Sequence, residues 1–333
     1  MNVLFLIQDA NLPSSRIRIQ NLVPELEGRG IKCVVRCYPK KLREKIALFK
    51  TAASYDAVYL QKKLPTFLEF YLLRRAARKL IFDFDDAIYC RHDSKTNQRS
   101  LTRRFRFQRV VRHADLVVAG NAFLAKAAQN YTSARVVIIP SGVETRQIPL
   151  KKHEQNKESK TVIGWVGTAG NFTQLAIALP SIVRLAEETP IELRVISNQP
   201  PDFGFKPVRF IPWSLVTQAE EIAHFDIGIM PLPSTEFSAG KCGYKALQYM
   251  AAGVPPVVSD VGGNSQIITN GIHGLVVAQP DLFYNALKSL IQNQKLRKEL
   301  GLNARERVES LFSIHVVGKM LAAEIFPLLS SSK

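Results

Sequence analysis

One segment, from Pro231 to Asn264, places its most polar residues where an expected strand passes into an expected helix. On a helix, Lys241, Lys245 and Gln248 are spaced at i, i+4 and i+7, so all three side chains would project from one face. The N-terminus of a helix attracts anions through its unpaired N–H groups and its dipole, and two lysines there would strengthen that attraction. The segment therefore predicts an anion site, and a diphosphate is an anion that suits two lysines.

A second group of residues with binding chemistry follows the first expected strand. Ser14 and Ser15 are good helix N-cap residues, and capping is the structural alternative to a binding role. Arg16 and Arg18 go beyond capping, because an arginine beside a helix N-terminus suits a phosphate or a carboxylate. We expect these four residues to bind an anionic group, and the family resemblance described below implies that this group belongs to an acceptor.

Short apolar runs alternate with helical or polar stretches along the chain. This alternation predicts an α/β fold with parallel sheets and helices on both faces. The stretch KKHEQNKESK (151–160) has no apolar residue and is typical of an interdomain linker. Two doubly wound domains are therefore expected, and the carboxyl ends of both sheets would face a cleft between them. The expected strands are Val3–Ile7, Cys33–Cys37, Ala57–Leu60, Leu80–Phe84, Leu116–Ala119, Val136–Ile139, Val162–Val166, Leu193–Ser197, Val208–Ile211, Ile227–Met230, Pro256–Ser259 and Leu275–Val277, followed by helices at 280–292, 295–311 and 316–329.

The positive charge is concentrated in the first half of the chain. The net charge is +17, and residues 1–150 contribute +15 of it, with 27 Lys and Arg against 12 Asp and Glu. Three basic runs carry much of this excess, at 40–45, 72–79 and 99–113. A solvated helix face explains any single run, but three runs in one domain favour an anionic partner: a membrane surface, a phosphorylated acceptor or nucleic acid.

Length and composition set the broad class. The 333 residues allow two α/β domains. No apolar run reaches 18 residues, and the first ten residues lack the basic region and cleavage site of a signal peptide. The four cysteines are scattered, which is typical neither of a disulfide framework nor of a zinc site. These observations predict a cytoplasmic protein.

An ordered set of motifs resembles the GT-B nucleotide-sugar glycosyltransferases, specifically the retaining group called family 4. In chain order the motifs are ADLVVAGNAFL (114–124), VVIIPSGVE (136–144), VRFIPW (208–213), EEIAHFDIGIMPLP (220–233), the segment 231–264 and NGIHGLVV (270–277). The resemblance implies a GT-B fold of two doubly wound, Rossmann-like domains facing a central cleft. It implies an acceptor-binding domain (1–150), a linker (151–160), a domain that binds the nucleotide sugar (161–312) and a C-terminal helix (313–333) that crosses back to the first domain.

Family members usually carry two glutamates eight positions apart, the first binding the transferred sugar and the second the ribose. Registration on MAAGVP (250–255) places Gly240 and Gln248 at these positions, so this chain departs from the pattern at both. Gln248 can still hydrogen-bond a ribose hydroxyl, whereas Gly240 offers only its backbone. Glu236 is our candidate for the missing carboxylate, with an ordinary exposed loop residue as the alternative. Trp213 is expected to pack on the nucleotide base, although core packing is the commoner fate of Trp.

The family often places basic residues in and after the loop that follows the first strand of the second domain. Here that loop, GWVGTAGNFTQL (164–175), has none. Its candidate donor-binding residues, which approach a phosphate through N–H groups and a hydroxyl, are Gly167, Thr168 and Ala169. They cannot neutralise a leaving diphosphate, so we expect Lys241 and Lys245 to act as catalytic residues that supply the charge. Surface lysines without such a role are the alternative.

Asp83-Phe84-Asp85 resembles the Asp-x-Asp that binds a metal in the other transferase architecture, GT-A, and three nearby carboxylates can hold Mg²⁺ or Mn²⁺. Family 4 members often have His-Asp at the end of this strand, near the transferred sugar, and Asp85-Asp86 falls there. We therefore favour contacts with sugar or acceptor hydroxyls over a metal site, with Asp85 catalytic and Asp86 binding the acceptor. Neither a metal nor a cofactor is expected, because the nucleotide sugar is a substrate.

The resemblance implies transfer of a sugar from a nucleotide-sugar donor with retention, by front-face attack, because the sequence offers no compelling nucleophile for double displacement. The acceptor is expected to be a lipid-linked or cell-envelope glycan at the inner face of a membrane, to which the basic first domain binds. This predicts a peripheral membrane protein of polysaccharide biosynthesis. Three alternatives stay open: a GT-B module that binds nucleotide sugars without turnover, an epimerase of the same architecture and a basic nucleic-acid-binding protein. Nucleic acid is not expected as a partner, because no recognisable binding motif is present.

Overall fold

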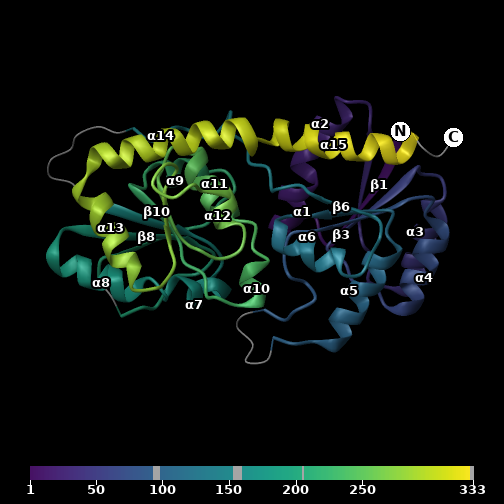
Figure 1. Cartoon of the computed structure of the whole chain (residues 1–333), viewed down its shortest axis with the longest axis horizontal. Helices are drawn as coiled ribbons and strands as arrows, with labels where there is room; N and C mark the ends of the chain where they lie inside the picture. The colour runs from purple at the N-terminus through teal and green to yellow at the C-terminus, as the bar shows by residue number, and fades with distance from the viewer. Residues whose placement is uncertain (93–97, 153–159, 205, 331–333) are drawn as a thin grey trace. The chain divides into compact units, whose positions relative to one another are not determined.

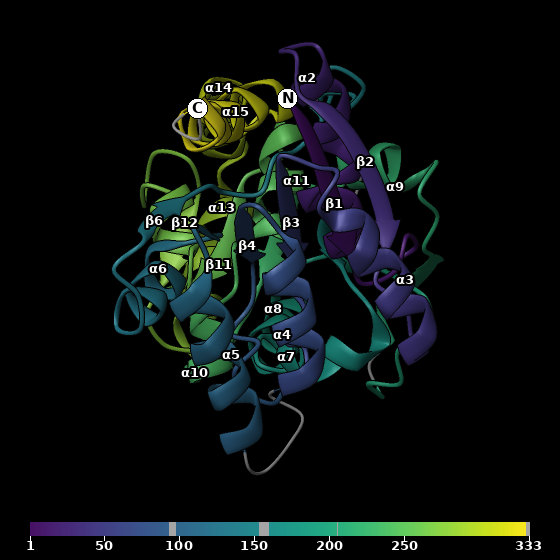
Figure 2. The same ribbon diagram turned by 90° about the vertical axis from the view of Figure 1, so that its right-hand side faces the viewer.

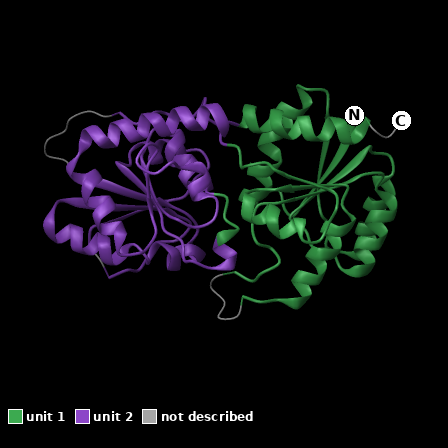
Figure 3. Ribbon diagram, viewed as in Figure 1, with its two compact units in different colours: residues 1–142, 239–242, 314–333 green, residues 143–238, 243–313 purple. Residues whose placement is uncertain are grey.

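The computed structural model describes residues 1–92, 98–152, 160–204 and 206–330 (Figure 1). The chain divides into two compact units (Figure 3). Unit 1 comprises residues 1–142, 239–242 and 314–333, and unit 2 comprises residues 143–238 and 243–313. Of the predicted linker 151–160, residues 153–159 lie outside the described residues.

Unit 1 is built on a six-stranded parallel sheet of order β2-β1-β3-β4-β5-β6. Its strands are β1 (Asn2–Ile7), β2 (Lys32–Cys37), β3 (Ala57–Gln61), β4 (Leu80–Phe84), β5 (Leu116–Ala119) and β6 (Arg135–Ile138). Its helices are α1 (Pro13–Arg18), η1 (Gln20–Leu22), α2 (Val23–Glu27), α3 (Leu42–Ala52), α4 (Phe67–Ala76), α5 (Leu101–His113), α6 (Ala122–Gln129) and α15 (Ile314–Ser330).

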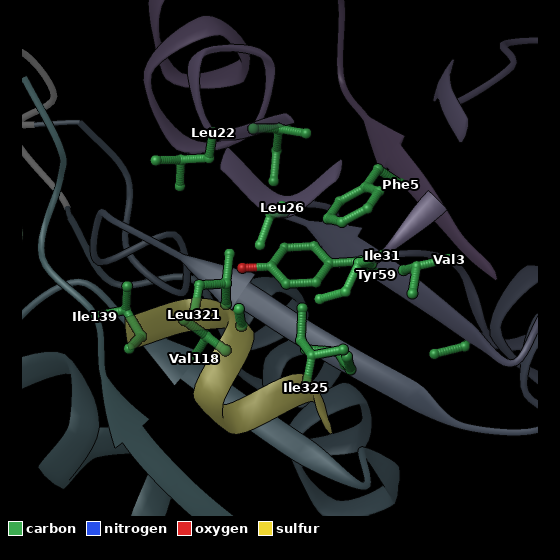
Figure 4. Close-up of a cluster of buried hydrophobic side chains, with 14 of the residues drawn as sticks. Val3, Phe5, Leu22, Leu26, Ile31, Tyr59, Val118, Ile139, Leu321 and Ile325 are labelled. Atoms are coloured by element: carbon green, nitrogen blue, oxygen red, sulfur yellow. The ribbon is translucent and has the colours of Figure 1, made fainter. Parts of the chain in front are cut away.

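The core of unit 1 lies between this sheet and the helices on its faces. Strands buried on both faces are continuous apolar runs rather than alternating ones, and β1 is such a run. Figure 4 shows one cluster of this core, in which Leu321 and Ile325 of α15 lie close to Tyr59 of β3. The last helix of the chain therefore completes the core of the unit that the first strand begins.

Unit 2 repeats this architecture with a six-stranded parallel sheet of order β12-β11-β10-β7-β8-β9. Its strands are β7 (Thr161–Val166), β8 (Ile191–Ser197), β9 (Val208–Pro212), β10 (Ile227–Met230), β11 (Pro256–Ser259) and β12 (Leu275–Val277). Its helices are η2 (Ala169–Asn171), α7 (Phe172–Leu175), α8 (Leu179–Glu188), α9 (Gln218–Ala223), α10 (Glu236–Ala239, whose last residue belongs to unit 1), α11 (Tyr244–Ala251), α12 (Asn264–Ile267), α13 (Leu282–Gln292) and α14 (Gln294–Leu311).

Each of the twelve predicted strands is present, and the predicted α/β fold with two doubly wound sheets is confirmed. The strand order reverses between β1 and β3 in unit 1 and between β7 and β10 in unit 2. Open α/β sheets bind their ligands beyond the carboxyl ends of the strands at such a switch point. Among the described residues, no helix is both long and apolar enough to cross a membrane.

Close packing across glycines fixes helix α11 on the sheet of unit 2. Gly228 of β10 faces the ring of Tyr249, because a Cβ at residue 228 would lie only 2.4 Å from the Cδ2 atom of that ring. The Tyr249 hydroxyl donates to the carbonyl of Ile229 at 3.2 Å and accepts the N–H of Val166 at 3.1 Å. Helix α11 is thus held at the switch point, with Lys245 one turn before Tyr249.

Candidate functional site

The loop after β7 lies at the switch point of unit 2 and is held by the neighbouring strand. The N–H of Gly167 donates to the carbonyl of Ile196 at 3.0 Å, and the N–H of Ala169 donates to Oδ1 of Asn198 at 2.8 Å. Thr168 is exposed, and its hydroxyl accepts the Nδ2 group of Asn171 at 3.0 Å. Two of the N–H groups predicted to meet a phosphate are therefore already bonded, while the Thr168 hydroxyl still has its own proton to donate.

Lys245 reaches this loop from helix α11. Its Nζ atom lies 4.3 Å from the ring centroid of Trp165, a fully buried side chain at the end of β7. A Cβ at residue 167 would lie 3.0 Å from the same Nζ atom and 2.5 Å from the Trp165 ring, so Gly167 leaves the room that the lysine occupies. A cation on an aromatic face keeps its attraction for anions, because the ring carries no net charge. The predicted pairing of Lys245 with the loop 167–171 is consistent with this geometry.

Lys241 does not share the helix face of Lys245 and Gln248, so this prediction is wrong. Helix α11 begins only at Tyr244, and Gly243 before it has a φ of +66°. This left-handed conformation, which glycine adopts without strain, breaks the helical spacing that the sequence suggested. Lys241 precedes the break and belongs to unit 1.

The structure does bring Trp213 and Gln248 together. The Nε1 group of Trp213 donates to Oε1 of Gln218 at 3.0 Å, and Nε2 of Gln248 lies 3.4 Å from that oxygen. Trp213 is exposed beyond the end of β9, and Gln218 begins helix α9. Gln218 was not among the predicted site residues, although it starts a helix five residues after Trp213. The predicted donor-binding roles of Trp213 and Gln248 stay predictions.

At the switch point of unit 1, four charged side chains form a network. Nζ of Lys62 lies 3.0 Å from Oδ1 of Asp85 and also contacts Asp86, and Nζ of Lys241 lies 2.9 Å from Oδ1 of Asp86. Lys62, directly after β3, has a φ of +55°, the one positive φ outside glycine in the described part of the chain. Such a conformation costs free energy and marks a functional or tightly constrained position. Lys62 was not among the predicted site residues, because a lysine after a strand is common.

Opposite charges stabilise the ionised forms in this network. Burial alone would raise the pKa of Asp86, but Lys62 and Lys241 lower it to about 2. Burial alone would lower the pKa of Lys62, but Asp85 and Asp86 raise it well above its usual range. Lys62 and Asp86 are therefore charged at neutral pH, and Asp86, predicted to bind the acceptor, already holds two cations.

Residues Ala239–Cys242, here called the inserted segment, are anchored in unit 1 by Asn121. The Nδ2 group of Asn121 donates to the carbonyls of Ala239 at 3.3 Å and of Lys241 at 3.0 Å. Its Oδ1 atom accepts the N–H of Leu124 at 2.9 Å and so caps helix α6. An Asn after a strand and before a helix is a recognisable cap, but its second role was not visible in the sequence.

Gly240 and Cys242 fit the inserted segment closely against the residues that follow β4 and β5. A Cβ at residue 240 would lie 2.5 Å from the backbone N of Ala87, so a glutamate at this position would require the backbone to move. The Sγ atom of Cys242 lies 3.2 Å from the carbonyl oxygen of Asp85, and a Cβ at Gly120 would meet that sulfur at 2.3 Å. Gly240 therefore contacts unit 1 through its backbone, where family members place a carboxylate.

Helix α1 differs from the prediction for the first loop. It begins at Pro13 with Leu12 as N-cap, so Ser14 and Ser15 are not the cap residues; proline is favoured at the first helical position and sets this start. Arg18 is 2% exposed, pairs with Asp83 and donates to the carbonyl of Ile139 at 2.7 Å. Arg18 thus serves an internal pair rather than an open acceptor site.

Four further predicted site residues lie on helices α1 and α10. Ser15 is fully buried, Ser14 and Arg16 are half-buried on helix α1, and Glu236 is the half-buried first residue of α10. Their roles stay predictions. Within the described residues, no group of three or more His, Cys, Asp or Glu side chains is arranged to hold a metal ion. Asp83 turns to Arg18, whereas Asp85 and Asp86 turn to Lys62.

Comparison with known families now adds to this geometry. Residues 160–293, which include the loop 167–171, Lys245 and Gln248, match the family model described as "Glycosyl transferases group 1". This match covers less than half of the chain. The matched residues contain the β7 loop and the helix that carries Lys245, so both elements of the proposed anion site lie within them.

Relatives outside this chain agree with the domain and the fold. YtcC of Bacillus subtilis, named as a glycosyltransferase, is 33% identical over 75 residues, which are 22% of this chain and 18% of YtcC. HepE of Anabaena, solved with UDP and glucose, is 14% identical with a TM-score of 0.73, and both chains are covered completely. Sucrose-phosphate synthase of Thermosynechococcus elongatus is 15% identical with a TM-score of 0.75, again over both whole chains. The resemblance to GT-B glycosyltransferases is therefore confirmed for the family domain and for the fold.

Proposed function

We propose that this chain is a glycosyltransferase that moves a sugar from a nucleotide-sugar donor held by unit 2 to an acceptor held by unit 1. The observation that carries the proposal is the position of Lys245, inside the glycosyl transferase domain, on the Trp165 ring beside the loop after β7. A cation at the switch point of a doubly wound sheet suits the diphosphate of such a donor.

The chemistry that fits these residues is retention of configuration by front-face attack. The leaving phosphate accepts the proton of the attacking hydroxyl, and the protein orients both substrates and stabilises the developing negative charge. Lys245 supplies that charge stabilisation, while the hydroxyl of Thr168 donates to a phosphate oxygen. Asp85 and Asp86 are proposed to position the sugar and the acceptor, with Lys62 holding their carboxylates in place.

The class of acceptor is proposed from the net charge of residues 1–150 and not from the side chains at the two switch points. The excess of 27 Lys and Arg over 12 Asp and Glu in residues 1–150 supports an anionic surface as a partner. We propose a lipid-linked or cell-envelope glycan acceptor, peripheral attachment to the inner face of the membrane and a role in polysaccharide biosynthesis. UDP and UDP-glucose in the HepE structures support uridine donors as the first to test.

A thermal-shift screen with UDP-, GDP- and ADP-sugars tests the donor before any acceptor is known. A selective rise in melting temperature with one nucleotide sugar supports the proposal, and no rise with any of them contradicts it. Lys245→Ala should then lower turnover by about a hundredfold while most of the thermal shift is kept. Lys295→Ala, an exposed lysine of the same unit, is the matched control. Normal turnover in Lys245→Ala would refute the role of this lysine.

A binding module without turnover is the second candidate, and one observation favours it. Gly240 lies where family members place a glutamate, and the Ala87 backbone leaves no room for that side chain. A selective thermal shift combined with no transfer and no donor hydrolysis, over a panel of acceptors, would identify this module.

A further inference from the structure

Helices α4 and α5 of unit 1 expose large apolar side chains on one surface. Phe67 and Tyr71, one turn apart on α4, are 71% and 52% exposed, and Leu101 and Phe105, one turn apart on α5, are 73% and 65% exposed. Figure 2 shows the two helices side by side on the near side of unit 1. Soluble proteins bury most such side chains, so a group of them on neighbouring helices marks an interaction surface.

A cavity of about 400 Å³ lies between the two helices. The rings of Phe67, Phe70 and Tyr71 line it on α4, and Arg109 of α5 closes it from the other side. The guanidinium carbon of Arg109 lies 5.5 Å from the Phe67 centroid, which joins the exposed faces of the two helices. The cavity thus combines an aromatic wall with a cation.

The charge around this surface is of one sign. Helix α5 carries five arginines and no acidic residue, and Arg75 of α4 lines the cavity without an ion pair or hydrogen bond to the described part of the chain. Arg74, in contrast, is bonded to the carbonyl of His113 and to Asp115. Arg75 is therefore an exposed cation beside exposed rings, and no ion pair or hydrogen bond ties it to the described part of unit 1.

We propose that this α4–α5 surface is where the protein docks on a membrane that contains anionic phospholipid. Lipid phosphates would meet Arg75 and Arg109, while Phe67 and Phe105 would enter the interface between headgroups and acyl chains. The exposed aliphatic Leu101 favours a lipid over a nucleic acid, because bases stack on rings and gain little from leucine. The proposal deepens the proposed function and rests on it only for the expectation of a membrane-bound acceptor.

Sedimentation with lipid vesicles tests the proposal. The full chain should bind vesicles of phosphatidylcholine with about 30% phosphatidylglycerol at least about tenfold more tightly than vesicles of phosphatidylcholine alone. The double variant Phe67→Ser/Phe105→Ser should lose about tenfold in binding at low and at high salt, because the loss is of apolar contact. Arg75→Glu should lose binding mainly at low salt, because salt screens charge.

Val216→Ser and Arg209→Glu are matched controls, since both residues are exposed in unit 2. Unchanged thermal unfolding shows that each variant is folded. Equal vesicle binding by the α4–α5 variants and the controls would overturn the proposal. It would also be overturned if the unchanged chain bound nucleic acid but no vesicles at physiological salt, and the α4–α5 variants abolished the nucleic-acid binding. The thermal shift with nucleotide sugars is measured separately. If the unchanged chain binds vesicles but shows no thermal shift with any nucleotide sugar, the proposed function is refuted and the proposed docking surface is not.

Discussion

At the switch point of unit 1, Lys62 lies between two carboxylates, whereas at the switch point of unit 2, Lys245 lies on an aromatic ring. Both lysines occupy the carboxyl edge of a six-stranded parallel, doubly wound sheet, although the strand order differs between the two units. Two carboxylates offset the charge of a lysine and hold it in place, whereas an aromatic ring holds a lysine without adding a negative charge of its own. The doubly wound architecture thus carries one edge organised by internal ion pairs and one edge at which we propose a phosphate site.

The largest loss in the free energy of unfolding is expected when the ion-pair network of unit 1 is broken. Lys62→Met leaves the carboxylates of Asp85 and Asp86 partly buried with one cation fewer, and should lower the free energy of unfolding by about 3–5 kcal/mol. Urea denaturation followed by circular dichroism measures the change. Lys63→Met is the neighbouring control, since Lys63 contacts only the Tyr38 ring among the described contacts. Similar losses in the two variants would show that Lys62 is an ordinary surface lysine.

Acid should weaken unit 1 through Asp86. Its pKa falls from the ordinary value of 3.8 to about 2 on folding, so it stabilises the fold above pH 3.8 and loses that contribution as the pH falls toward 2. The contribution is about 2–3 kcal/mol. Melting temperatures between pH 5 and pH 2 should therefore fall less steeply in Asp86→Asn than in the unchanged chain. Parallel pH profiles would contradict the lowered pKa.

In unit 2, the packing of helix α11 should contribute more to the free energy of unfolding than charge does. Gly228→Ala puts a methyl group into the ring of Tyr249, and should lower the free energy of unfolding by about 1–3 kcal/mol. Because Tyr249 fixes helix α11, turnover should fall further than stability alone explains. Gly170→Ala is the control for stability alone, since a Cβ there meets nothing within 4 Å. An unchanged melting temperature in Gly228→Ala would show that α11 tolerates displacement.

The smallest expected change in stability concerns the exposed Trp213. Trp213→Phe removes the bond from Nε1 to Gln218, at a cost below about 1 kcal/mol in unfolding free energy. The thermal shift caused by the preferred nucleotide sugar should nevertheless shrink if Trp213 packs on the base. An identical shift in this variant would remove Trp213 from the donor site, whereas a smaller one would extend the site of unit 2 beyond Lys245.

The strands could be predicted from the sequence because buried parallel strands are short continuous apolar runs, as β1 and β10 show. The start of helix α11 could not, because the spacing of Lys241, Lys245 and Gln248 is helical and only the backbone of Gly243 breaks it. The predicted Lys245 and loop 167–171 come together because both follow adjacent strands at one switch point. Lys62 was missed because its importance comes from Asp85 and Asp86, more than twenty residues away in the chain.

Cys242 makes the inserted segment observable by simple chemistry. Its thiol is buried against Gly120, and burial raises its pKa well above the usual range, so it reacts slowly with thiol reagents while the segment stays in place. Cys37 is exposed and should react first. The labelling rate of Cys242, compared with that of Cys37, therefore reports the local opening of residues 239–242 in the intact chain without any substitution.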